Sequence, residues 1–305
     1  MTSRQQQASS LPGRLAWALA LALALFVAGM SGAHAQKPFD SPEAAMNAFG
    51  EAIASNDDNA MKALLGAKFR DLIPPVGADV RQRFLEAWQV SHAVQPEDDS
   101  HARIAVGNDG WTLPVPLVKT SKGWQFDTRA GVDEMRIRRI GRNELAVIQT
   151  MLAIYDAQRE YARTDHDGDG LLAYAGQLAS TAGKQDGLYW PTSDGEPPSP
   201  LGAAFLLAGK RNPGQGGYYG YHYKLLTAQG PNAPGGAYNY VVNGKLFGGF
   251  AVLAWPVRYG DTGVKSFMVS HDGQVYERDL GPDGAGKAAA TKAFDPGPGW
   301  TKVTP

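Results

Sequence analysis

Three aspartates in the segment DHDGDG, at 165–170, are the residues with the sharpest chemical pattern. Asp165, Asp167 and Asp169 match the first, third and fifth positions of a calcium loop, and a glycine follows at the sixth, where such a loop turns sharply. Hard carboxylate oxygens are the ligands that Ca²⁺ prefers. The twelfth position is Gly176, where an EF-hand carries a bidentate glutamate. The spacing therefore predicts a weak calcium site, and the alternative is a metal-free polar turn at the end of a helix.

Aromatic residues set among glycines in the second half of the chain form a second group. Flat rings beside small residues can make a platform for sugar rings or peptides. Alternate residues of a strand share one face, so rows of aromatic residues also arise from ordinary core packing and cross-strand pairs. We favour this second interpretation. The candidate ligand-binding residues are Tyr189, Trp190, Tyr219, Tyr221 and Tyr223.

No catalytic constellation accompanies these groups. The histidines are scattered without an H-E-x-x-H pair, and the chain after residue 35 has neither a G-x-S-x-G nor an S-x-x-K motif. Asp186 and Glu196 could form a glycosidase pair, but among 30 acidic residues some such pair always occurs. We therefore predict no catalytic residue.

Composition excludes several classes of protein. The chain has 305 residues and no cysteine, which rules out disulfides, cysteine-ligated zinc, iron–sulfur clusters and a thiol nucleophile. Lys and Arg total 29 against 30 acidic residues, whereas a nucleic-acid partner requires a basic surface. We expect no nucleic-acid partner.

The first 35 residues have the three parts of a secretory signal peptide. Arg4 and Arg14 give a basic start without acids, an apolar run follows at 15–30, and a small-x-small motif ends at Ala35. The run is shorter than the roughly 20 residues of a spanning helix. No twin arginine is present, which favours the general secretion route. We expect cleavage after Ala35, no membrane span afterwards, and a periplasmic or secreted protein.

The elements that position the candidate residues are predicted to form two α+β domains. The first, 36–135, begins with short helices within 40–66, and Ser41 is a suitable N-cap for the first of them. A further helix is expected at about 80–90, followed by a meander of antiparallel strands within 101–129. Helices followed by a curved antiparallel sheet are similar to the cone-shaped nuclear-transport-factor-2-like fold.

The second domain, 136–305, is predicted to pair one long helix with an antiparallel sheet. Apolar residues recur at helical spacing within 143–163. The charged segment 132–142 is a plausible hinge between the domains. Its arginines form either an anion site or docking patch or, as we favour, an ion-paired start of this helix. Strands are expected at 219–228, 238–244, 248–257, 264–271 and 274–280.

Long strings in this second part resemble a family of exported bacterial proteins labelled domain of unknown function 2950. The resemblance extends over nearly the whole chain after residue 35 and implies a secreted bacterial protein, without an activity or catalytic residues. The strings include RRIGRNELAVIQ (138–149), GKQDGLYWP (183–191), LTAQGPNAPGGAYNYVVNG (226–244) and GGFAVLAWPVRYGDTGV (248–264).

The second domain is also similar to the soluble part of type IV pilins and pseudopilins, which pair a long helix with an antiparallel sheet. NELAVIQ, GYHYKLLTA and TGVKSFMVSHDGQVY carry this likeness. The chain lacks the prepilin cleavage pattern, and no apolar anchor precedes its helix. The resemblance therefore implies a pilin-like fold without polymerisation through an N-terminal helix.

These observations predict an exported, non-catalytic protein of the bacterial envelope that binds or assembles with an envelope protein or a glycan, with calcium as a stabilising cofactor. The alternative is a secreted hydrolase that acts on cell-wall or extracellular polymer through an aromatic-rich cleft. A pocket carboxyl group with a raised pKa would favour the hydrolase. A flat exposed surface or a paired sheet edge would favour the binding protein.

Overall fold

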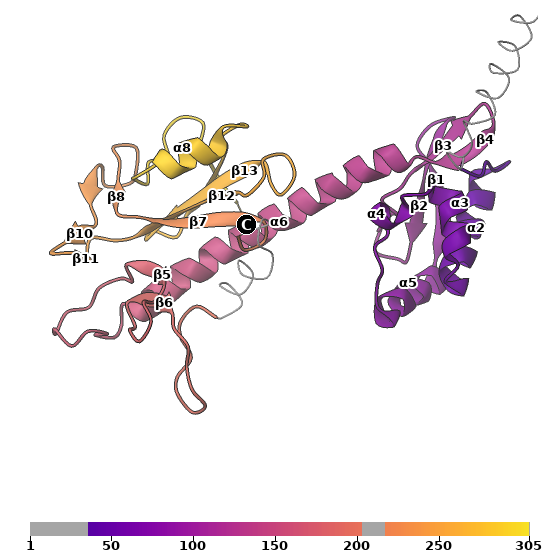
Figure 1. Cartoon of the computed structure of the whole chain (residues 1–305). Helices are drawn as coiled ribbons and strands as arrows, with labels where there is room; N and C mark the ends of the chain where they lie inside the picture. Colours follow the sequence, from indigo (N-terminus) through magenta and orange to yellow (C-terminus); the bar gives the residue numbers. More distant parts are fainter. Residues whose placement is uncertain (1–35, 203–216, 305) are drawn as a thin grey trace, which may run out of the picture. The chain divides into compact units, whose positions relative to one another are not determined.

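The structure, a computed structural model, describes residues 36–202 and 217–304 of an α+β chain (Figure 1). The chain divides into two compact units, Met1–Val132 and Asp133–Pro305. The predicted signal peptide, residues 1–35, lies outside the described residues. Among the helices of the described parts, none combines the length and the apolar character needed to cross a membrane.

From residue 36 onward, the described part of the first unit begins with four helices, and the N-caps of α2 and α3 follow from local sequence. The side chain of Ser41 accepts a hydrogen bond from the backbone N–H of Ala44, which confirms the predicted N-cap. Asp57 caps the next helix by accepting from the backbone N–H groups of Asn59 and Ala60. The helices are α2 (Pro42–Ser55), α3 (Asp58–Leu65), α4 (Phe69–Leu72) and α5 (Ala78–Val90).

A four-stranded antiparallel sheet with the order β1-β2-β3-β4 completes this unit. The meander expected from the sequence is present, and β1 adds a strand that was not predicted, because its residues are mostly exposed and it ends at a proline. Phe49 and Phe126 pack together in the core between helices and sheet, with ring centroids 5.6 Å apart. The strands are β1 (His92–Pro96), β2 (His101–Val106), β3 (Leu117–Thr120) and β4 (Gly123–Phe126).

The first described residues lie against this sheet. The backbone of Phe39 pairs with that of Trp124 through two hydrogen bonds of 2.7 and 2.9 Å. Gly123 has a φ of +121°, and a side chain there would collide with the carbonyl oxygen of Phe39. The Gln125 side chain also donates to the carbonyl of Gln36. Hydrogen bonds with β4 thus hold the chain at Gln36, the first described residue, and at Phe39.

Helix α6 (Thr128–Tyr161) includes the charged segment 132–142, which is therefore helical. Arg138 pairs with Glu134 at a spacing of four, a favourable arrangement on a helix surface. The ion-paired start of the helix that the sequence favoured is confirmed. The residues of α6 from Asp133 onward belong to the second unit.

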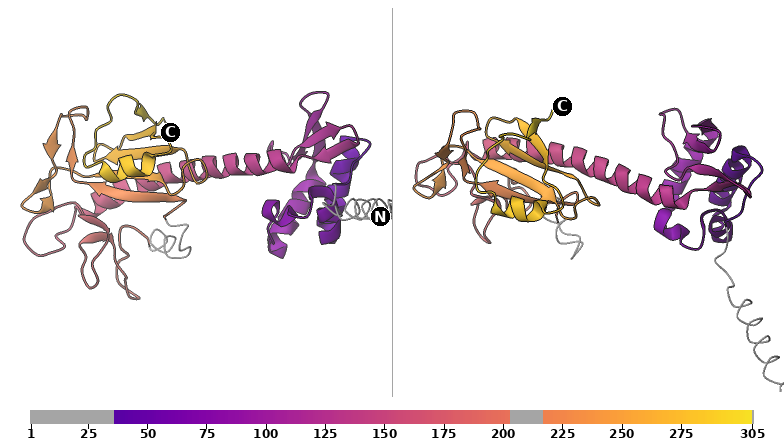
Figure 2. Two further views of the ribbon diagram at one scale, coloured as in Figure 1. Left: turned by 45° about the horizontal axis from the view of Figure 1, so that its top comes forward. Right: turned by 90° about the horizontal axis from the view of Figure 1, so that it is seen from above.

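A five-stranded antiparallel sheet, ordered β15-β14-β13-β12-β7, forms the centre of the second unit. Helix α8 (Gly284–Ala290) and helix α6 cover opposite faces of this sheet (Figures 1 and 2). On the α8 side, the ammonium of Lys224 donates to the carbonyls of Ala289 and Thr291 at the end of that helix. The strands are β7 (Tyr221–Leu226), β12 (Ala251–Pro256), β13 (Lys265–Ser270), β14 (Val275–Asp279) and β15 (Thr301–Lys302).

Three two-stranded sheets surround the central one. The strand expected at 238–244 is instead split, because its two parts pair with different neighbours, β8 and β11. The narrower resemblances to nuclear-transport-factor-2-like and pilin-like folds stay predictions. The short strands are β5 (Gln177–Ala179), β6 (Gly187–Tyr189), β8 (Ala228–Gln229), β9 (Tyr238–Asn239), β10 (Val241–Val242) and β11 (Lys245–Leu246).

One buried side chain joins the end of α6 to the segment that follows it. The amide of Gln158, which is 0% exposed, donates to the carbonyl of Ala175 at 3.0 Å and accepts from its N–H at 2.8 Å. This pair closes the loop that contains the three aspartates. Gln158 thereby satisfies two buried backbone groups that have no strand partner.

Replacing Gln158 by Met, which has nearly the same shape, should leave both backbone groups of Ala175 unpaired. We expect a loss of about 2–4 kcal/mol in the free energy of unfolding. The melting temperature measured by calorimetry should fall by about 5–10 °C. The control is Gln149→Met on the exposed side of the same helix. Equal melting temperatures for the two variants would contradict this role of Gln158.

Candidate functional site

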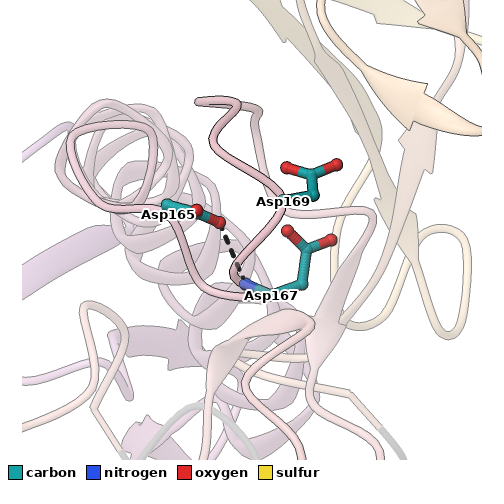
Figure 3. Close-up of side chains that lie close together, drawn as sticks. All are labelled: Asp165, Asp167 and Asp169. Carbon is teal, nitrogen blue, oxygen red and sulfur yellow. Dashed lines mark hydrogen bonds between the residues drawn. The ribbon is translucent and has the colours of Figure 1, made fainter.

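The three aspartates predicted as metal ligands converge on one loop directly after α6. Carboxylate oxygens of Asp165, Asp167 and Asp169 lie within 4.8 Å of one another, and Figure 3 shows the three side chains on successive turns of this loop. Gly176, at the position where an EF-hand has its glutamate, contributes no side-chain oxygen. The donor set present in the loop is therefore three carboxylates, fewer than the six to eight oxygens that Ca²⁺ takes.

Asp165 organises the loop. One of its oxygens accepts from the N–H groups of Asp167 at 3.2 Å and Gly168 at 2.8 Å, and the other accepts from Gly170 at 2.8 Å. Gly168 and Gly170 have φ values of +74° and +84°, which a glycine adopts without strain. The hydrogen bond from Gly170 is the main cause that lowers the pKa of Asp165.

Lys245 supplies a positive charge to the other two aspartates. Its Nζ lies 2.7 Å from an oxygen of Asp167 and also forms an ion pair with Asp169. Hydrogen bonds to Lys245 are the main cause of the lowered pKa of Asp169, and hydrogen bonds to both aspartates raise the pKa of Lys245. Three negative charges thus face one positive charge, and the loop keeps a net charge that attracts a further cation.

Two neighbouring hollows open beside this loop. Their volumes are about 510 and 860 Å³, within the range of small-molecule sites. The smaller one reaches Lys245 and Leu246 on β11, and the larger one reaches Trp190 and Glu196. Both hollows are lined by Tyr161, His166, Asp167 and Asp186.

A stack of rings forms one wall of the larger hollow. The imidazole of His166 lies 3.9 Å from the ring of Tyr161, nearly parallel to it, and meets Trp190 edge-on at 5.5 Å. The Nε2 of His166 donates to the carbonyl of Tyr161. The Tyr161 hydroxyl donates to the carbonyl of Gln185 at 2.6 Å, and burial raises its pKa to about 12. These hydrogen bonds fix the positions of the Tyr161 and His166 rings, as a recognition surface requires.

The structure separates the predicted aromatic residues into two groups. Tyr221 and Tyr223 are in β7 and face α6, where Tyr221 is fully buried and Tyr223 interacts with Thr150. Burial raises the pKa of both hydroxyls. These two rings are core residues, and Tyr221 in particular has no surface to offer a ligand. The core explanation for the row of tyrosines therefore applies.

The remaining aromatic candidates lie at different places. Tyr219 precedes β7 in a left-handed conformation with a φ of +51° and is 48% exposed. Tyr189 ends β6 and packs, partly buried, against the core. Trp190 follows it and lines the larger hollow. Of the five aromatic candidates, Trp190 therefore stands beside the aspartate loop.

Asp186 and Glu196, the acidic pair considered from the sequence, both line the larger hollow. Asp186 accepts from the N–H of Thr181 at 2.7 Å and from its hydroxyl at 2.8 Å, and the first of these bonds is the main cause that lowers its pKa. Glu196 accepts from the N–H of Ser193 at 2.8 Å. Both oxygens of Asp186 and one oxygen of Glu196 therefore hold their own loops.

Sequence reasoning missed the residues that complete this site. Lys245 is more than seventy residues from the aspartates, in a turn without a motif, so no spacing could connect them. Tyr161 is the last residue of α6, and His166 lies between Asp165 and Asp167. Their closeness in sequence to the aspartates could have indicated that they belong to the same site. The ring stack with Trp190 depends on the return of the chain through β6.

Comparison with known proteins gives one result that covers the site. The sequence pattern of the family described as protein of unknown function (DUF2950) matches residues 36–303, which extend over parts of both units and include the aspartate loop and the residues that line both hollows. Neither the curated proteins nor the solved structures contain a significant match. The chain belongs to the DUF2950 family, as its strings of residues indicated.

Proposed function

We propose that this chain is an exported, non-catalytic binding protein of the bacterial envelope that recognises a glycan through the hollows beside the aspartate loop. The observation that carries the proposal is the stack of Tyr161, His166 and Trp190 on one wall of a hollow of about 860 Å³ that also has charged and amide side chains. Sugars are bound by an aromatic ring against one face and by polar groups that accept and donate hydrogen bonds around it.

The polar groups suited to that task surround the ring stack. Lys184, Gln185 and Glu196 line the larger hollow and are exposed. Carboxylate, amide and ammonium groups together provide acceptors and donors for hydroxyl groups. The same lining combines these polar groups with the rings of Tyr161 and Trp190, a mixture that suits a sugar with both polar edges and apolar faces.

Export rests on the sequence of residues 1–35. A basic start, a short apolar run and the small-x-small end at Ala35 are the features that a signal peptidase reads. In this proposal the chain after Ala35 is released into the periplasm or the medium. The absence of cysteine from the whole sequence is compatible with either compartment.

Calcium is proposed as a structural partner of the loop. The carboxylates of Asp165, Asp167 and Asp169 already converge, so a cation needs little reorganisation of the backbone. Lys245 partly neutralises the loop, and a bound Ca²⁺ would have to replace its ammonium at Asp167 and Asp169. With few ligands and this competition, we expect affinity in the weak range of extracellular sites.

The hydrolase alternative requires a general acid that is protonated at neutral pH, and therefore a carboxyl group with a raised pKa. In the larger hollow the pKa of Asp186 is shifted in the opposite direction. This observation favours binding without turnover. Release of soluble sugar from purified cell-wall polymer would instead support the hydrolase.

Adding 10 mM Ca²⁺ to metal-free protein should raise the melting temperature by about 3–10 °C, the stabilisation expected for a weak site that binds only the folded state. Asp167→Asn should abolish this rise, because it removes a ligand charge. Asp156→Asn, at an exposed position of α6, is the matched control and should keep it. An equal rise with Mg²⁺, or none in the unchanged protein, would argue against a calcium site.

Lys245→Met should act in opposite directions with and without calcium. Without calcium the variant should melt lower, because Asp167 and Asp169 lose their positive partner. With calcium it should bind the ion roughly 3- to 10-fold more tightly, the range expected from exposed ion pairs, since no ammonium has to be displaced. Calorimetric titration measures both effects, and weaker binding by the variant would refute competition for one place.

Trp190→Ala should reduce retention of the protein on isolated peptidoglycan at least about fivefold, as for a central aromatic contact. Tyr259→Ala removes an exposed ring that is not in the lining of either hollow and should leave retention unchanged. Sedimentation with purified sacculi measures the bound fraction, and chromatography of the supernatant detects released sugar. Equal losses in the two variants would contradict recognition at the hollow.

A further inference from the structure

The first unit contains an apolar groove of about 450 Å³ that has no part in the site described above. Its floor is made of buried side chains from α2, α3, α4 and the segment before β3. Its rim includes large apolar residues that stay open to solvent, with Val76 51%, Val80 42% and Trp111 44% exposed. The floor includes Phe49, Met61, Phe69, Leu72 and Leu113.

Helix α5, which forms one side of the groove, is incompletely covered. It has no fully buried residue, although Phe84, Leu85 and Trp88 form an apolar side. Helix α2, by contrast, buries Met46 and Phe49 completely or nearly so. A helix normally buries its apolar stripe against the core. The half-covered stripe of α5 therefore leaves apolar surface available to a ligand.

Two arginines give the groove its charge. Arg70 lies over the ring of Phe69 and pairs with Asp58 at 2.5 Å, so its charge is already balanced. Arg81, on α5, is half-buried in the lining and has no acidic partner among residues 36–202 and 217–304. A guanidinium beside apolar surface is a favourable place for a carboxylate.

The shape and lining of the groove limit the kind of ligand that it can bind. The wall between α4 and α5 contains Pro74 and Pro75, which have no backbone N–H, so this wall cannot pair with an added β-strand. A volume of about 450 Å³ is that of a small-molecule pocket and too small for a packed helix. A flexible apolar chain with one anionic end fits these limits.

We propose that the first unit binds a single unbranched fatty acid, with the acyl chain in the groove and the carboxylate on Arg81. The apolar floor removes the chain from water, and the guanidinium forms a charge-assisted, bidentate hydrogen-bonded pair with the head group. This site is independent of the glycan proposal, because it lies in the other unit and uses none of the same residues.

Calorimetric titration of the purified protein with dodecanoate, below its micellar concentration, tests the proposal. We expect saturable binding with one molecule per chain, and affinity that falls about fourfold for each methylene removed from the chain. Dodecanol should bind at least tenfold more weakly, because it lacks the charge that pairs with Arg81. Absence of binding, or equal affinity for dodecanol, would overturn the assignment.

Two variants on α5 distinguish the loss of the Arg81 charge from a loss of folding. Arg81→Gln should weaken dodecanoate binding about tenfold and leave dodecanol binding unchanged. Arg83→Gln, on the same helix but outside the groove lining, should change neither. Circular dichroism checks that both variants are folded. If Arg81→Gln binds dodecanoate as tightly as the unchanged protein, the carboxylate is not held by this residue and the proposal fails.

Discussion

The burial of one face of α6 against the five-stranded sheet is the contact on which the second unit depends. Val147, Met151 and Ile154 have no exposed surface in this contact. Because this part of the helix is packed on the sheet, the last turn that follows it has a defined direction. Gln158 then ties the returning chain at Ala175 to that turn. The aspartate loop is the short segment enclosed between these constraints, so its geometry follows from the packing of the helix.

Electrostatic balance is the second organising factor of the site. Three aspartates that converge after the end of a helix repel one another unless donors or cations face them. Backbone N–H groups satisfy Asp165, and Lys245 faces Asp167 and Asp169. These partners offset part of the repulsion, and the loop retains negative charge toward solvent. The hollows lie beside this charge, which gives any ligand there a polar and partly ionic environment.

Sequence patterns over a few adjacent residues predicted much of the fold, but they could not predict contacts between residues that are far apart in the chain. The cap at Ser41, the helical stripe of α6 and the strands β12, β13 and β14 each follow from a few adjacent residues. The convergence of the aspartates was also visible in their spacing. Alternation did place Tyr221 and Tyr223 on one face, but it carried no information on which face α6 covers. Lys245 was beyond prediction because its partners are distant in the chain.

The pairing of Phe39 with Trp124 has a consequence for the order of events during maturation. Only three residues separate the expected cleavage point after Ala35 from this backbone pair, and Gln36 already accepts from Gln125. A peptidase needs an extended, accessible chain on both sides of the bond that it cuts. Once Phe39 has paired with Trp124 and the Gln36 carbonyl accepts from Gln125, that stretch is no longer free. In the proposed export route, cleavage after Ala35 would therefore precede the closure of the first unit.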